Sequence, residues 1–103
     1  MTRFALLAAL VALATPTFAA DEISKEDDCA YQADVVGAIQ TARMDRVRES
    51  KLAEAIAATE PTWPEQYNNA ITILSGPIYQ LKRRDLKGID LSAQWKEACL
   101  SRE

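Results

Sequence analysis

The sequence predicts an all-α fold, a small antiparallel bundle of three to four helices closed by one disulfide between Cys29 and Cys99. Three observations predict this fold class. Apolar residues recur along the chain with the 3.6-residue period of a helix. No useful stretch shows the strict alternation of a half-buried strand. The two cysteines, the only ones in the chain, bracket almost everything that follows an apolar N-terminal run.

The first 20 residues have the features of a cleavable secretory signal. Arg3 supplies a positive charge, residues 4–14 are apolar, and Ala19 and Ala20 suit a signal peptidase. The apolar run is shorter than the roughly 20 residues that span a bilayer. We expect a signal over 1–20, one domain over 21–103 with no stable membrane anchor after cleavage, and export to the periplasm or beyond the cell. An uncleaved N-terminal anchor is the alternative.

The cysteine pair fits a structural disulfide. Exported proteins lie where disulfides persist, and two cysteines allow a single intramolecular pairing. Closing so long a loop should stabilise the fold by about 4 kcal/mol. Redox-active pairs are usually close in sequence, as in C-x-x-C, whereas Cys29 and Cys99 are far apart. A redox or metal role and an intermolecular pairing remain alternatives.

The first two helices follow the apolar pattern. Ser24 is a predicted N-cap of a helix that extends to about Asp45. Its inward stripe consists of Cys29, Val35, Val36, Ile39 and Ala42. A second helix covers about 47–59, with Leu52, Ala55 and Ile56 facing inward. No strong breaker separates the two, so one long bent helix is the alternative.

A third helix is predicted from Trp63 to about Arg84. Thr62 and Glu65 have the spacing of a capping box, and Pro64 suits the first turn. A kink or short break is expected over 75–77, where a proline interrupts the pattern. The inward stripe consists of Tyr67, Ala70, Ile71, Leu74, Ile78 and Leu81.

The chain ends with a basic run and a last helix. Four cations are expected at the end of the third helix, where they suit its dipole: Lys82, Arg83, Arg84 and Lys87. Gly88 provides a turn, and Asp90 or Ser92 caps the last helix. Its inward residues are Leu91, Trp95, Ala98 and Cys99.

The residue inventory argues against most catalytic chemistry. The chain has no histidine, which removes the commonest general base and metal ligand. Its three glycines form no phosphate-cradling loop. Loss of Arg3 with the signal makes the chain more acidic than its net charge of −3, which argues against nucleic-acid binding. The sequence therefore predicts no catalytic residues, no metal and no other cofactor.

Three residues are candidate binding contacts: Arg43, Trp63 and Tyr67. Arg43 falls within the apolar stripe of the first helix, where a guanidinium needs a partner. That partner is a ligand carboxylate or phosphate, or else Asp85 or Asp90 in an internal ion pair; a buried stem with a solvated head is the further alternative. Trp63 and Tyr67 each carry a polar group, an indole N–H and a hydroxyl, on an aromatic ring. Such side chains suit an interface, or the core of a small domain that lies close to water.

The overall layout resembles that of small uncharacterised exported proteins of proteobacteria. The resemblance rests on the signal, a cysteine early in the first helix, an arginine near that helix's end, the Trp63-Pro64 turn and a cysteine near the C-terminus. It implies no activity. Acid-stress periplasmic chaperones are similar in size, helicity and single disulfide, but their cysteines enclose a shorter loop and their sequence pattern differs.

These observations predict a non-catalytic binding or accessory protein of the cell envelope. Its partner would be another protein, an envelope component or a second copy of the chain. A stress-type chaperone that exposes apolar surface in acid is the second hypothesis. A small enzyme, which would need a pocket that gathers acids and Arg43, is the third.

Overall fold

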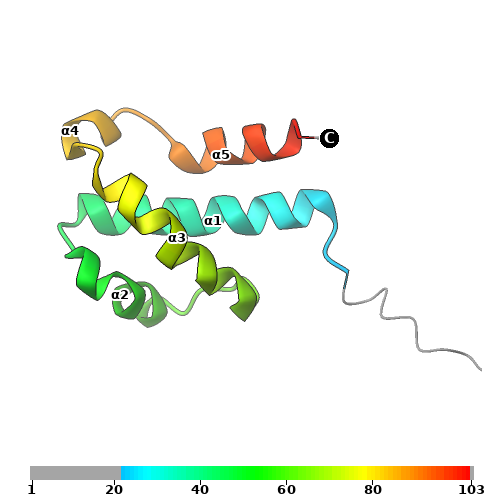
Figure 1. Cartoon of the computed structure of the whole chain (residues 1–103), viewed down its shortest axis with the longest axis horizontal. Helices are drawn as coiled ribbons and strands as arrows, with labels where there is room; N and C mark the ends of the chain where they lie inside the picture. Colours follow the sequence, from blue (N-terminus) through cyan, green and yellow to red (C-terminus); the bar gives the residue numbers. More distant parts are fainter. Residues whose placement is uncertain (1–21, 103) are drawn as a thin grey trace, which may run out of the picture.

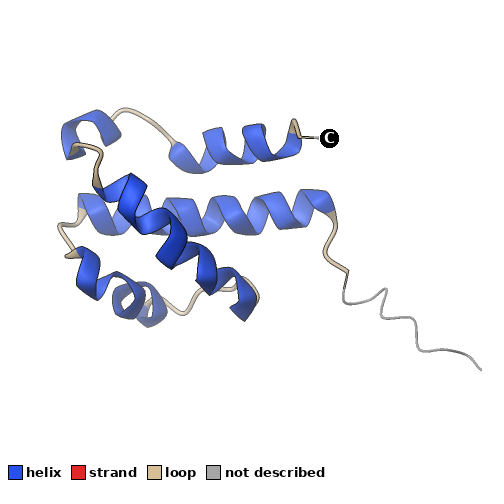
Figure 2. Cartoon of the chain, in the orientation of Figure 1, coloured by secondary structure: helices blue, strands red, loops and turns tan. Residues whose placement is uncertain are grey.

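Helix α1 (Lys25–Met44) is the axis on which the other helices pack (Figure 1). The computed structural model describes residues 22–102, so the signal predicted for 1–20 lies outside the described residues. Figure 2 shows this part of the chain as helices and connections, without a strand. The predicted all-α class is therefore confirmed. The other elements are the 3-10 turns η2 (Glu49–Lys51) and η3 (Glu65–Tyr67) and the helices α2 (Leu52–Ala58), α3 (Asn68–Tyr79), α4 (Arg83–Leu86) and α5 (Leu91–Leu100).

Helix α1 begins and packs as the sequence predicts. The Ser24 hydroxyl accepts a hydrogen bond from the backbone N–H of Asp27 at 3.1 Å, and acidic residues occupy the first turn. The inward stripe is buried, with Val35 and Ile39 completely inaccessible to solvent. None of the helices within residues 22–102 is both long and apolar enough to cross a membrane.

The break after α1 comes from a helix C-terminus that lacks glycine. Arg46 has a φ of 66°, in the left-handed region that glycine usually occupies. Its N–H donates to the carbonyl of Arg43 at 3.2 Å, and the N–H of Val47 donates to the carbonyl of Ala42 at 2.9 Å. This pair of bonds is a Schellman motif. The first and second helices are therefore separate, which decides between the two alternatives that the sequence left open.

The start of the third helix differs from the prediction. Pro64 precedes the 3-10 turn η3, and α3 begins only at Asn68. Thr62 and Glu65 form no capping box, since no side chain caps η3. The backbone of the η3 turn is held instead by the 3.0 Å hydrogen bond from the N–H of Tyr67 to the carbonyl of Pro64.

The end of the third helix also differs. Of the kink or short break predicted over 75–77, the break is absent, because α3 continues through Pro77 to Tyr79. Ile73 and Pro77 are both exposed, so water can reach the carbonyl that the proline leaves without a partner. Leu81 lies beyond the helix and is 40% exposed, so its predicted inward position is wrong.

The basic run forms a separate short helix, α4, rather than the end of the third helix. Gln40 of α1 secures this part of the chain: its Nε2 donates to the carbonyls of Leu86 and Ile89 at 3.0 and 2.8 Å. Its Oε1 accepts from the N–H of Leu91 at 3.1 Å. One side chain thus bonds three backbone groups of the turn, of which the carbonyl of Leu86 also accepts from the N–H of Ile89 at 3.3 Å.

Helix α5 lies antiparallel beside α1 (Figure 1). Asp90 caps it by accepting from the N–H of Ala93 at 3.0 Å. The two helices approach closely where a Cβ on Gly37 would meet the Ser92 Cβ at 3.3 Å. Ala98 is exposed, so its predicted inward position is wrong, and no residue of α5 is fully buried.

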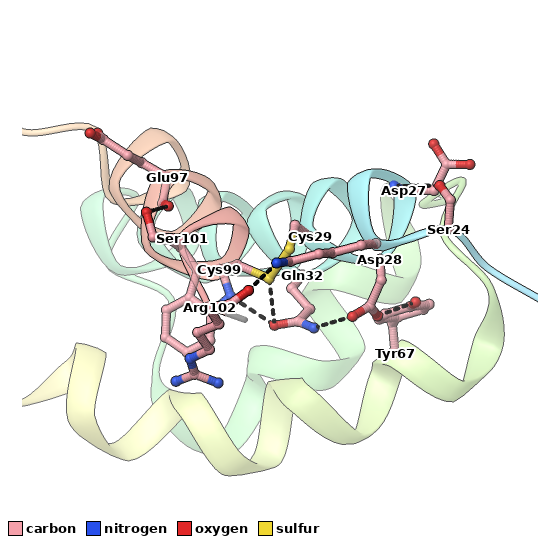
Figure 3. Close-up of a disulfide and its surroundings, with 12 residues drawn as sticks. Ser24, Asp27, Asp28, Cys29, Gln32, Tyr67, Glu97, Cys99, Ser101 and Arg102 are labelled. Atoms are coloured by element: carbon pink, nitrogen blue, oxygen red, sulfur yellow. Dashed lines mark hydrogen bonds between the residues drawn. A yellow bond between two sulfur atoms is a disulfide. The ribbon is translucent and has the colours of Figure 1, made fainter.

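The disulfide joins the start of α1 to the end of α5, with Cα atoms 5.6 Å apart. Figure 3 shows Gln32 beside it. The Gln32 amide accepts from Trp95 Nε1 at 2.9 Å and donates to Asp28 at 2.9 Å. Asp28 in turn accepts from the Tyr67 hydroxyl at 2.6 Å. This polar chain links α5, α1 and η3.

Alkaline pH should weaken the fold through Tyr67. Burial, and then its hydrogen bond to Asp28, raises the pKa of Tyr67 to about 12 from the usual 10.0. Because the folded-state pKa is the higher one, this stabilisation is complete below pH 10.0 and is lost as the pH rises through about 12. Burial raises the pKa of Tyr79 as well, so Tyr79 adds to the loss.

The replacement Tyr67→Phe tests this expectation in denaturant unfolding at increasing pH. It should cost about 1.5–3 kcal/mol at neutral pH, because the Asp28 carboxylate loses a hydrogen-bond donor. It should also flatten the fall in stability above pH 10.0. An equally steep fall in the variant would contradict the assignment to Tyr67.

Candidate functional site

Four arginines from separate segments line one open pocket of about 340 Å³. We call it the arginine pocket. One arginine comes from the end of α1, two from the connection after α1 and one from the start of α4. Its lining residues are Arg43, Arg46, Val47, Arg48, Glu49, Tyr79 and Arg83.

Arg43 is held by the backbone just after the end of α3. Its Nε and Nη2 donate to the carbonyl of Leu81 at 3.4 and 3.2 Å. Its guanidinium carbon lies 5.5 Å from the ring centre of Tyr79, within cation–π range. A guanidinium has five N–H groups, so three remain for another acceptor. The alternative of an ion pair with Asp85 or Asp90 is wrong, because Arg43 pairs with neither within the described residues.

Tyr79 forms a rigid wall of the pocket. Its hydroxyl donates to the carbonyl of Val47 at 2.7 Å, which ties α3 to the connection after α1. That connection carries Arg46 and Arg48. The hydroxyl proton is therefore committed to the fold, and the guanidinium groups remain as the donors for a ligand.

Arg83 has a buried donor without a partner. Its Nε is inaccessible to solvent and makes no hydrogen bond within the described residues. An unsatisfied buried donor costs roughly 1–3 kcal/mol, and more when it is charged. The other guanidinium nitrogens of Arg83 are not buried without a partner, so they are the ones that an anion in the pocket can reach.

The charges of the pocket are unbalanced. Glu49 is its one acidic lining residue, against four guanidinium groups. Over residues 22–102 the one ion pair is Lys51 with Glu54, which lies outside the pocket. Four like charges beside a single counter-charge raise the local potential and attract anions.

The three predicted contact residues do not come together. Arg43 lies in the arginine pocket, near the C-terminal end of α1. Tyr67 is 9% exposed and bonds Asp28, near the opposite end of the same helix. The rise between Asp28 and Arg43 along α1 is about 22 Å.

Trp63 and Tyr67 serve the fold. Trp63 is half-buried against the core, and its Nε1 donates to Asn68 at 2.8 Å. The Tyr67 ring lies 5.2 Å from that of Tyr31. With their polar atoms already paired, neither residue belongs to the arginine pocket.

Sequence reasoning missed the other arginines of the pocket. Arg46 and Arg48 follow Arg43 at short spacing, and this local cluster is a signal that could have been read. Arg83 is expected only among the cations at the end of the third helix, because its proximity to Arg43 depends on how α3 packs on α1.

A second hollow of about 260 Å³ is almost wholly apolar. It lies between α3 and α5, with Val36 of α1 also in its lining and Gln94 as its one polar side chain. Ile78 and Trp95 lie on opposite sides of it. Such a hollow has few groups that could fix a ligand's orientation, whereas the arginine pocket is built almost entirely of them.

The fold and the pocket define a small all-α protein, closed by a terminal disulfide, with a cluster of arginines that form no ion pair among residues 22–102. Acidic and cysteine side chains in the described part of the chain form no cluster of three or more with the arrangement of a metal site. Comparison with family models, curated proteins and solved structures finds no match for the chain.

Proposed function

We propose that this protein is an exported, non-catalytic binding protein of the cell envelope that holds an anionic group of its partner in the arginine pocket. The observation that carries the proposal is the convergence of four arginines beside a single carboxylate, with no ion pair formed by these arginines among residues 22–102. Export rests on the sequence of residues 1–20, and the disulfide is compatible with an oxidising compartment.

The pocket suits binding better than catalysis. Guanidinium groups keep their proton at all ordinary pH values, so they donate hydrogen bonds but do not transfer protons. Tyr79, the remaining hydroxyl in the lining, is held neutral by its raised pKa and donates to Val47. A site of this composition holds carboxylate or phosphate groups through charge-assisted hydrogen bonds.

Arg46 offers a test that separates binding from folding. Its left-handed backbone favours glycine, so Arg46→Gly should leave the free energy of unfolding unchanged or raise it by up to about 1 kcal/mol. The same variant should bind anions about tenfold less tightly or worse, because one charge-assisted donor is lost. Calorimetric titration with sulfate, glycerol 3-phosphate and succinate measures the affinity.

Two control variants complete this test. Glu60 has a φ of 54° at the end of α2, so Glu60→Gly relieves the same kind of backbone strain outside the pocket. Arg84→Gln removes a positive charge beside the pocket without touching its lining. Neither control should weaken anion binding. The proposal fails if none of the three anions binds, or if Arg46→Gly binds them as tightly as the unaltered protein.

A further inference from the structure

We propose that the group held in the arginine pocket is the doubly charged phosphate of a phosphomonoester. The inference rests on the proposed function and narrows its ligand to one chemical class. A phosphate on a lipid headgroup and a phosphate on a soluble molecule share this chemistry.

The charge of the pocket favours a dianion. Four guanidinium groups face the single carboxylate of Glu49, so three positive charges are in excess. A monocarboxylate would compensate one of them and a phosphate dianion two. A phosphomonoester carries about −1.5 to −2 charges at neutral pH and offers three strong acceptor oxygens.

The arrangement of the arginines favours a tetrahedral group. They reach the pocket from three segments: the end of α1, the connection after it, and α4. A carboxylate presents its two oxygens in one plane, so the two parallel N–H groups of a single guanidinium satisfy it. Oxygens that point in three directions can accept from several guanidinium groups at once, including that of Arg83.

The arginines and the tyrosine of the pocket should keep their charge state between about pH 5 and pH 8. The groups that face it are the four arginines, Tyr79 from α3 and Glu49 from η2. The arginines stay charged, and burial raises the pKa of Tyr79 above its usual 10.0. The chain has no histidine. A phosphomonoester, with a second pKa near 6, changes its own charge in this range.

Titration with glycerol 3-phosphate at two pH values tests the inference. If the dianion is the bound form, affinity should be about tenfold higher at about pH 8 than at about pH 5, because roughly a tenth of the ester is dianionic at the lower value. Sulfate, a tetrahedral dianion throughout, should show no such change. Arg83→Gln should weaken both anions, and Arg84→Gln neither.

The possible outcomes separate the two proposals. Succinate binding as tightly as glycerol 3-phosphate at pH 8, or phosphomonoester binding that does not change with pH, overturns the phosphate assignment but leaves an anion site. Absence of binding by every anion overturns the proposed function as well. Vesicles of phosphatidylcholine with and without phosphatidic acid show whether the bound phosphate belongs to a lipid or to a soluble molecule. Retention on the vesicles that contain phosphatidic acid supports a lipid phosphate. Binding of glycerol 3-phosphate without retention on these vesicles supports a soluble one.

Discussion

Removal of the disulfide should cost this protein about 4 kcal/mol of stability. The replacement Cys29→Ala with Cys99→Ala opens a loop in which the two residues are separated by 70 positions. In the chain-entropy account, a crosslink over so long a loop removes much of the freedom of the unfolded chain. Domains of this size are stable by only about 5–15 kcal/mol in total, so the loss is a large fraction of the whole.

The loss should fall first on α5. No residue of this helix is fully buried, and its apolar contact with the core comes from the half-buried Leu91 and Trp95. Without the crosslink, its attachment depends on these two side chains and on the hydrogen bonds from Trp95 to Gln32 and from Leu91 to Gln40. We expect α5 to detach while α1, α2 and α3 retain their shared core.

Hydrogen exchange and tryptophan fluorescence measure this detachment. Amides of α5 should exchange much faster in the double variant than in the oxidised protein, while those of α1 change less. Trp63→Phe leaves Trp95 as the single tryptophan reporter, and its emission should shift to the red as it becomes solvated. Reductant should reproduce both effects in the unaltered protein and do nothing to the double variant. Equal acceleration in α1 and α5 would show that the crosslink stabilises the whole fold at once.

Local signals predicted the parts of the fold that local interactions determine. Ser24 and the apolar stripe fixed α1, because a cap and a buried face both lie within a few residues of one another. The end of that helix is hard to predict, because Arg46 takes the left-handed conformation at a position where most helices have glycine. The conformation is maintained by backbone hydrogen bonds that any residue could make.

Long-range contacts explain the errors at the third helix. The carbonyl of Leu81, beyond the end of α3, is satisfied by Arg43, which lies 38 positions earlier. Nothing near Leu81 in the sequence indicates such a donor, so the predicted helix continued to Arg84. The same contact explains why the arginine pocket escaped prediction. Arg43 was correctly singled out as a residue in need of a partner, but its neighbours in the pocket depend on how α3 and α4 return to α1.

Leu86→Ala should both destabilise the protein and weaken its anion binding. Helix α4 has four residues and no side-chain cap, so it is too short to persist alone. Leu86 anchors it, since its side chain is 1% exposed and its carbonyl accepts from Gln40. Truncation of a buried leucine costs about 2–5 kcal/mol. Because Arg83 begins the same helix, a loosened α4 should also misplace this arginine.

Ile89 provides the matched control for this prediction. It lies in the connection just after α4, is 40% exposed, and likewise loses a branched chain on replacement by alanine. Ile89→Ala should change the free energy of unfolding by no more than about 0.5 kcal/mol. Sulfate titration at a temperature where both variants remain folded, as judged by far-ultraviolet circular dichroism, compares their pockets. Unchanged sulfate affinity in a folded Leu86→Ala protein would show that Arg83 is positioned without α4, or that the pocket binds through the other three arginines alone.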